Sequence, residues 1–285
     1  MPQVKPLLTF SLVLVCFVAA HAEEIRPGVF RTPDDRFADL AGYDYEPHYI
    51  EIEGYRIHYV DEGPRAAEPV LLLHGEPTWA YLYRKVIPAV VDAGYRAIVP
   101  DLVGFGRSDK PANREDYSYA LQVNVIARFI KDMDLQGITL FCQDWGGLVG
   151  LRVAAENEDR FARIIAANTG LPEGDAPDGI ILGTQWTEPD PNATLSLDGG
   201  FMAWLKYSQT VPELPIGEIV QAGTLSMLSD AEVAAYDAPF PDARYKAGAR
   251  VMPALVASQQ TTNKKAWAVF EGWEKPFLTA FSDSD

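Results

Sequence analysis

The chain has 285 residues, 48% hydrophobic and 22% charged, which is the composition of a globular protein long enough to bury a large core. A formal net charge of −16 repels phosphate backbones, so we expect no nucleic-acid partner. Two cysteines and four scattered histidines predict neither a disulfide framework nor a metal site, and no motif calls for a cofactor.

Residues 1–22 have the features of a signal peptide. Lys5 lies in a short n-region, Leu7–Val18 is almost wholly apolar, and Ala20-His21-Ala22 matches a small-x-small cleavage site. The apolar run is too short to span a bilayer comfortably, although a membrane anchor or a misplaced start codon would be alternatives. We therefore expect a periplasmic or secreted protein with no membrane attachment after cleavage, which would retain Cys142 alone.

Residues 23–170 alternate between strand and helix signals. Two stretches of alternating polarity meet at Gly54 and predict a β-hairpin, while short continuous apolar runs predict strands buried on both faces. The expected strands are His48–Glu53, Tyr55–Asp61, Pro69–Leu73, Tyr95–Val99, Ile138–Cys142 and Ala162–Ala167. The expected helices are Trp79–Ala93, Ser118–Met133 and Leu148–Asn157. This order predicts an α/β fold with a mostly parallel sheet and helices on both faces.

The pattern changes at residue 171. Residues 171–241 are rich in Pro, Gly and Asp and contain short helical pieces, Gly200–Gln209 and Asp230–Tyr236, without a buried-strand signal. We interpret them as an inserted helical cap. Residues 242–285 return to the core with a helix near Lys264–Glu271 and one strand, Phe277–Phe281.

The segment Phe141-Cys142-Gln143-Asp144-Trp145-Gly146-Gly147 carries the central chemistry. A buried strand ends here, and small residues permit the sharp turn of a nucleophile elbow, with Asp144 at the usual position of serine. A carboxylate there can attack a saturated carbon and form an ester. The alternative is an Asp that only caps the following helix.

The segment His74-Gly75-Glu76-Pro77-Thr78-Trp79 directly follows a predicted strand. In an elbow of this kind the loop supplies one oxyanion-hole amide and the residue after the nucleophile supplies the other, here Glu76 and Trp145. We interpret His74 as a buried imidazole bonded to neighbouring backbone. The glycine-rich turn from Asp101 to Asp109 lacks the lysine and the spacing of a phosphate loop, so we assign it a structural role.

Together, HGEPTW, DLVGFGRSDKP and CQDWGG resemble the haloalkane dehalogenases of the α/β-hydrolase superfamily, in the subgroup with a late triad acid. The resemblance extends from about Phe37 to Asp285. It implies that Asp144 displaces halide from a small halogenated alkane, that water then releases the alcohol, and that indole N–H groups of Trp145 and a cap tryptophan bind the halide. The segment GFMAWLKY resembles the family's cap segment and implies Trp204, with Trp186 as the fallback.

The same resemblance places the triad acid after the last strand, at Asp285, with Asp283 as the competitor. Asn168 stands where another subgroup keeps its acid, and an amide cannot orient a histidine as a carboxylate does. The family's base is a histidine downstream of the acid, whereas the histidines of this chain all precede Asp144. We therefore expect a C-terminally truncated sequence that lacks the last strand and helix of the fold, exposes apolar surface there and has doubtful turnover.

Two other functions stay open. An epoxide hydrolase has the same fold and an aspartate nucleophile but activates its leaving oxygen with cap tyrosines, for which Tyr207 and Tyr236 are available. Glu76 and Gln143 argue against it, since epoxide hydrolases often carry an aromatic residue and a histidine at these positions. The other alternative is an inactive, truncated gene product. The sequence does not indicate the preferred halocarbon or the oligomeric state.

Overall fold

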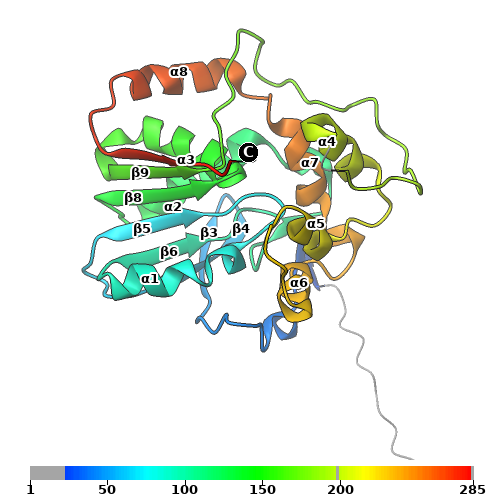
Figure 1. Ribbon diagram of the computed structural model, residues 1–285, viewed down its shortest axis with the longest axis horizontal. Helices are drawn as coiled ribbons and strands as arrows, with labels where there is room; N and C mark the ends of the chain where they lie inside the picture. Colours follow the sequence, from blue (N-terminus) through cyan, green and yellow to red (C-terminus); the bar gives the residue numbers. More distant parts are fainter. Residues whose placement is uncertain (1–22, 197–198, 284–285) are drawn as a thin grey trace, which may run out of the picture.

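The computed structural model describes residues 23–196 and 199–283. A seven-stranded sheet forms its centre, in the order β10-β9-β8-β5-β6-β4-β3 (Figure 1). The strands are β3 (His48–Ile52), β4 (Tyr55–Glu62), β5 (Pro69–Leu73), β6 (Arg96–Pro100), β8 (Ile138–Gln143), β9 (Phe161–Ala167) and β10 (Phe277–Ala280). The β3–β4 hairpin is antiparallel and β4 pairs antiparallel with β6, while all pairs from β6 to β10 are parallel. The sequence-based expectation of a mostly parallel sheet is confirmed.

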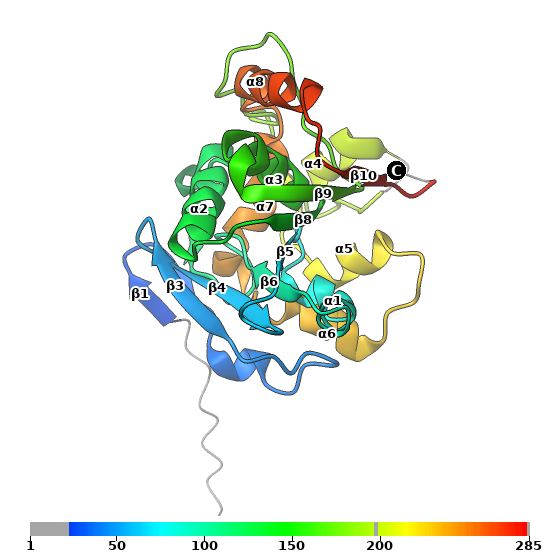
Figure 2. The ribbon, with the colours of Figure 1, turned by 90° about the vertical axis from the view of Figure 1, so that its left-hand side faces the viewer.

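Helices cover both faces of this sheet. The helices α2 (Tyr119–Asp132), α3 (Trp145–Glu156) and α8 (Gln260–Glu271) lie on one side, and α1 (Val86–Asp92) lies on the other (Figure 2). Because both faces are covered, every residue of the central strand β5 is buried, which explains its uninterrupted apolar sequence.

A second group of helices lies beyond the carboxyl ends of the parallel strands (Figure 1). It contains α4 (Gly200–Thr210), α5 (Ile216–Ala222), α6 (Asp230–Asp237) and α7 (Ala247–Leu255). The first three fall in the segment interpreted as a cap from the sequence. Hydrogen bonds connect α6 to the core, since the Trp79 indole donates to the Ala235 carbonyl oxygen at 3.1 Å and Arg84 pairs with Glu232 at 2.5 Å.

The remaining elements are short. A three-stranded sheet is formed by β1 (Glu23–Arg26), β2 (Val29–Arg31) and β7 (Lys110–Pro111). The 3-10 turns are η1 (Asp34–Phe37), η2 (Ala80–Tyr83), η3 (Arg114–Asp116), η4 (Glu158–Arg160) and η5 (Ala243–Tyr245). Among the residues that the structure describes, no helix is both long and apolar enough to cross a bilayer.

The single helix predicted over Trp79–Ala93 is wrong, because the chain forms η2 and then α1 with a break between them. Pro88 has no N–H to donate to the carbonyl of Arg84, so a continuous helix could not pair that group. The Tyr45 hydroxyl donates to the Arg84 carbonyl oxygen instead, at 3.0 Å.

Helix α7 was not predicted from the sequence. All nine of its residues are buried, so it has no solvent-facing polar side, and Gly248 and Pro253 both weaken a helix signal. It packs against α4, so the helical layer beyond the strand ends continues past residue 241.

Candidate active site

Asp144 lies at the sharp turn between β8 and α3. Its backbone φ of 51° falls in the left-handed region, which a non-glycine residue adopts only when the surrounding structure holds it there. The Asp144 amide donates to the carbonyl oxygen of Asn168 at 3.1 Å, and the Asp144 side chain does not cap α3. The turn therefore has the geometry of a nucleophile elbow, and the helix-cap interpretation of Asp144 is wrong.

Two glycines let the backbone of neighbouring elements approach this turn. A Cβ on Gly146 would lie 2.0 Å from the Leu73 carbonyl oxygen, so α3 starts in direct backbone contact with the end of β5. A Cβ on Gly75 would lie 2.4 Å from both Cβ and Oδ1 of Asp144, so the loop after β5 lies against the carboxylate itself. A larger residue at position 75 would therefore push the loop away from Asp144, and one at position 146 would push α3 away from β5.

The amide of Glu76 donates to Asp144 Oδ1 at 2.7 Å. Trp145 is the first residue of α3 and is buried, with its ring edge-on to Tyr119 at 5.1 Å between centroids. The structure therefore brings together three of the residues singled out from sequence: Asp144, Glu76 and Trp145. A short backbone hydrogen bond and a helix N-terminus both favour negative charge on the Asp144 carboxyl.

The side chain of Glu76 places a second carboxyl in the site, which the sequence analysis did not consider. Its Oε1 is enclosed and has no hydrogen-bond partner among the described residues. Burial, and then the negative charge of Asp144, raise the pKa of Glu76 well above its ordinary value of 4.5. Of the two carboxyls, Glu76 is therefore the weaker acid by this shift, and the hydrogen bond from the Glu76 amide favours the negative charge on Asp144.

The loop after β9 supports the elbow from the other side, and sequence reasoning missed this. The Thr169 hydroxyl donates to the Asp144 carbonyl oxygen at 2.6 Å. The Asn168 side chain donates to the Ser282 hydroxyl at 2.9 Å and accepts from the Ser282 amide at 3.2 Å. The only signal in the sequence was the position of both residues directly after a strand next to β8.

These bonds bring the segment after β10 close to the elbow. Asp283, the competitor for the triad acid, follows Ser282 directly and is exposed. Asp285, the first choice for that acid, lies outside the described residues. The Asn168 side chain therefore joins the end of β9 to the segment after β10 by hydrogen bonds.

Three aromatic residues singled out from the sequence lie in the cap segment, namely Trp204, Trp186 and Tyr236. Trp204 is on α4, is half-buried and packs against the core, with its ring 6.3 Å from that of Tyr207. Trp186 is also half-buried and packs against Gly183. Tyr236 accepts a hydrogen bond from Arg84 at 3.3 Å.

Both buried histidines are engaged in structural hydrogen bonds. His74 Nε2 accepts from the Leu102 amide at 3.0 Å, so its Nδ1 carries the proton and donates to the Gly75 carbonyl oxygen at 2.9 Å. His58 Nδ1 lies 2.7 Å from Asp101 Oδ2. Burial lowers the pKa of both imidazoles. This geometry agrees with the structural interpretation of His74.

Asp101 anchors the glycine-rich turn. Its fully buried carboxylate accepts from the amides of Ala80 and Arg107, both at 2.8 Å, as well as from His58. Burial alone would raise the pKa of Asp101, but its interactions with the imidazoles of His58 and His74 and the hydrogen bond from the Ala80 amide lower it to about 2.

We expect Asp101→Asn to destabilise the fold by about 2–4 kcal/mol, because the amide nitrogen of asparagine would face a donor. The pKa of Asp101 in the folded chain, about 2, lies below its ordinary value of 3.8. Its contribution of about 2 kcal/mol is therefore complete above pH ~4 and is lost as pH falls towards ~2. Urea unfolding between pH 2 and 7 measures this loss, which Asp101→Asn should not show. An equally steep loss in the variant would contradict the assignment.

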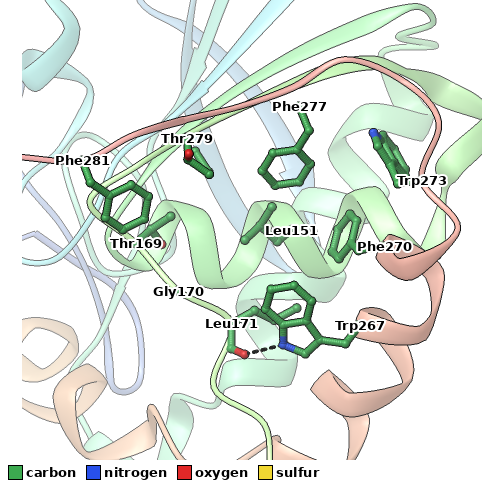
Figure 3. Close-up of a pocket in the computed structure, with 11 residues that line it drawn as sticks. Leu151, Thr169, Gly170, Leu171, Trp267, Phe270, Trp273, Phe277, Thr279 and Phe281 are labelled. Carbon is green, nitrogen blue, oxygen red and sulfur yellow. Dashed lines mark hydrogen bonds between the residues drawn. The ribbon is translucent and has the colours of Figure 1, made fainter.

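An apolar groove of about 350 Å³ lies beside the elbow, between α3, α8 and β10 (Figure 3). Its wall is mostly apolar, and the Trp267 indole donates to the Leu171 carbonyl oxygen at 2.8 Å. The aromatic lining residues are Trp267, Phe270, Trp273, Phe277 and Phe281. All residues of the edge strand β10 are exposed. Within the described residues no group of three or more His, Cys, Asp or Glu side chains could hold a metal ion.

Comparison with known proteins identifies the family. The model of the alpha/beta hydrolase fold family matches residues 68–273. A haloalkane dehalogenase of Psychrobacter cryohalolentis is 50% identical over 267 residues, which cover 90% of this chain and 82% of the relative, and one of Mycolicibacterium paratuberculosis is 44% identical over the same shares. The structure of haloalkane dehalogenase DpaA from Paraglaciecola agarilytica superposes with a TM-score of 0.75 at 34% identity, covering 88% of this chain and 81% of that one. The chain belongs to the haloalkane dehalogenase family of the alpha/beta hydrolase fold.

Proposed function

We propose that the protein cleaves carbon–halogen bonds of small haloalkanes through an ester on Asp144. The observation that carries this proposal is the 2.7 Å hydrogen bond from the Glu76 amide to an aspartate, in place of serine, at a strained elbow. The relatives named as haloalkane dehalogenases support the same chemistry.

In the first half of the reaction, a carboxylate oxygen of Asp144 attacks the carbon that bears the halogen. A carbon–oxygen bond forms, the carbon–halogen bond breaks, and the halide leaves with the electron pair. The other carboxylate oxygen becomes the ester carbonyl, within reach of the amides that we assign to the oxyanion hole, Glu76 and Trp145.

We assign the leaving halide to the indole N–H groups of Trp145 and Trp204. An indole donates without offering an acceptor, which suits a large, weakly hydrated anion. Trp145 is buried at the elbow, and Trp204 lies in the helical layer beyond the strand ends.

We expect Trp204→Phe to slow alkylation of Asp144 roughly 10- to 100-fold, because a hydrogen bond to a charged group contributes about 1.5–3 kcal/mol. Trp186→Phe, which changes the other cap tryptophan, should leave the rate unchanged. The rate is measured from halide release in a single turnover with 1-bromobutane. A large effect of Trp186→Phe with none of Trp204→Phe would assign halide binding to Trp186 instead of Trp204.

In the second half, a base must remove a proton from the water that attacks the ester. None of the four histidines in the 285 residues follows Asp144, and His58 and His74 are both held by structural hydrogen bonds. We infer that a polypeptide of these 285 residues is alkylated once and then stalls. We assign the triad acid that would orient a histidine to Asp285, with Asp283 as the competitor.

Intact mass after incubation with 1-bromobutane tests this function. The expected result is one butyl group per chain and about one equivalent of bromide. Sustained bromide release would contradict the stalled intermediate, and a chain with no added mass and no bromide would support an inactive gene product.

The alternative of an epoxide hydrolase needs an acidic hydroxyl near the leaving oxygen. Burial raises the pKa of both Tyr207 and Tyr236, which makes them weaker acids, and Tyr236 already bonds to Arg84. Both observations favour a halide leaving group. An adduct with styrene oxide and none with 1-bromobutane would reverse this preference.

We also propose export of the chain with cleavage after Ala22. The predicted signal peptide, residues 1–22, lies outside the described residues, and the apolar run Leu7–Val18 followed by Ala20-His21-Ala22 supports the proposal. Fractionation of expressing bacteria, followed by N-terminal sequencing, tests this proposal.

A further inference from the structure

The carboxyl of Glu76 has no part in the reaction described above, although it lies in the same site as Asp144. Its own amide is fixed on Asp144 Oδ1 at 2.7 Å, and Gly75 holds the loop backbone against the same carboxylate. The backbone from which the Glu76 side chain extends is therefore held against the reacting carboxylate.

The surroundings of Glu76 favour its protonated form while Asp144 is charged. Glu76 Oε1 is enclosed and has no partner among the described residues, which disfavours the ionised carboxyl, and the charge of Asp144 disfavours it further. Asp144 is better suited to hold the charge, since it receives the Glu76 amide and stands at the N-terminus of α3. We therefore assign the negative charge of these two carboxyls to Asp144.

The other titratable groups near the loop do not change this balance. Burial lowers the pKa of His74, raises the pKa of the Cys142 thiol to about 12 and raises the pKa of Tyr83 well above its ordinary value. All three are therefore neutral near pH 7. Asp144 is the group whose charge acts on Glu76.

Alkylation removes that charge, because the Asp144 carboxylate becomes a neutral ester and the halide departs. We propose that Glu76 holds a proton while Asp144 is ionised and releases it when Asp144 is alkylated, so that a proton and a halide leave the protein together. The step balances: Asp144 carboxylate, protonated Glu76 and haloalkane give Asp144 ester, ionised Glu76, halide and a proton delivered to solvent. This inference rests on the proposed function and adds a residue to it.

The proposal differs from alkylation without Glu76, in which no proton is released until water attacks the ester. A neighbouring charge shifts the pKa of a carboxyl by about 1–3 pH units. Proton release should therefore occur within a pH window of that width. Between the two ionisation points, the proton yield should approach one per halide. Below the window the proton yield should fall to zero, because Glu76 is protonated both before and after alkylation. Above the window it should also fall to zero, because Glu76 is ionised both before and after alkylation.

Single-turnover release of bromide and protons from the 285-residue chain with 1-bromobutane, measured with an indicator dye in weak buffer from pH 5 to 10, tests this inference. Glu76→Gln should release no proton for each bromide that it releases, whatever its rate of alkylation, since glutamine has the same shape and no ionisable proton. Glu158→Gln, at an exposed position in η4, is the matched control and should keep both.

The outcomes separate the two proposals. Bromide and a butyl adduct without protons at any pH would overturn the role of Glu76 and leave the function of Asp144 intact. Absence of both bromide and adduct would overturn the proposed function itself. A proton burst that persists in Glu76→Gln would assign the proton to another group. If Glu76→Gln does not fold, Glu76→Asp should retain the burst with a shifted window, and an unshifted window would count against the proposal.

Discussion

Asp144→Asn should abolish alkylation of the chain by 1-bromobutane, with a fall in the single-turnover rate of more than about 10³-fold. The amide is a very weak nucleophile, but it has the size and shape of the carboxylate. Aspartate already adopts the φ of 51° at this position, and asparagine differs from it only at the end of the side chain, so the backbone is not an obstacle to folding. Intact mass and bromide release measure the effect.

The stability of this variant separates a chemical role for Asp144 from a structural one. The charge of Asp144 raises the pKa of Glu76. A raised carboxyl pKa lowers the stability of the folded chain at neutral pH, and removal of the Asp144 charge reverses part of that loss. We therefore expect Asp144→Asn to unfold at the same or a higher urea concentration than the native chain, as is common when an active-site group is neutralised.

Asp159→Asn is the matched control, since Asp159 is exposed in η4, and it should leave alkylation and stability unchanged. Peptide mapping after alkylation should locate the butyl group within residues 141–147. A butyl group that appears elsewhere, at the same rate in native chain and Asp144→Asn, would show that Asp144 is not the nucleophile.

Local patterns in the sequence were sufficient for the sheet and for the elbow. The apolar runs that predict β5 and β8 are buried strands in the structure, and the small residues around Asp144 do form a sharp turn. These features depend on a few neighbouring residues, so their signal is present in a short window.

The parts that were missed depend on contacts between distant segments. Thr169 bonds to Asp144 from 25 positions away, and Asn168 bonds to Ser282 from 114 positions away. The carboxyl of Glu76 was overlooked for the same reason: its pKa depends on Asp144, which lies 68 positions further along the chain. Helix α7 was missed because Gly248 and Pro253 weaken the helix signal of a short segment, which tertiary packing overrides.

Gly146→Ala should destabilise the chain by roughly 3 kcal/mol and slow alkylation at the same time. Helix propensity alone predicts the opposite, since alanine is favoured over glycine inside a helix by about 1 kcal/mol. The added Cβ would, however, lie 2.0 Å from the Leu73 carbonyl oxygen, and neither backbone can move without shifting α3 or β5. A shift of α3 would carry Asp144 away from the Glu76 amide and lengthen their 2.7 Å hydrogen bond.

Alanine substitutions at two further glycines, with progressively weaker steric contacts, complete a series with Gly146→Ala. A Cβ on Gly150 would lie 2.9 Å from the end of the Leu73 side chain, which can turn aside, so Gly150→Ala should have a small effect on both quantities. A Cβ on Gly170 would meet nothing within 4 Å, so Gly170→Ala should have none. Urea unfolding and single-turnover alkylation of the three variants measure the series. If Gly146→Ala matched Gly170→Ala in both, the backbone contact between α3 and β5 would not be what holds the nucleophile in place.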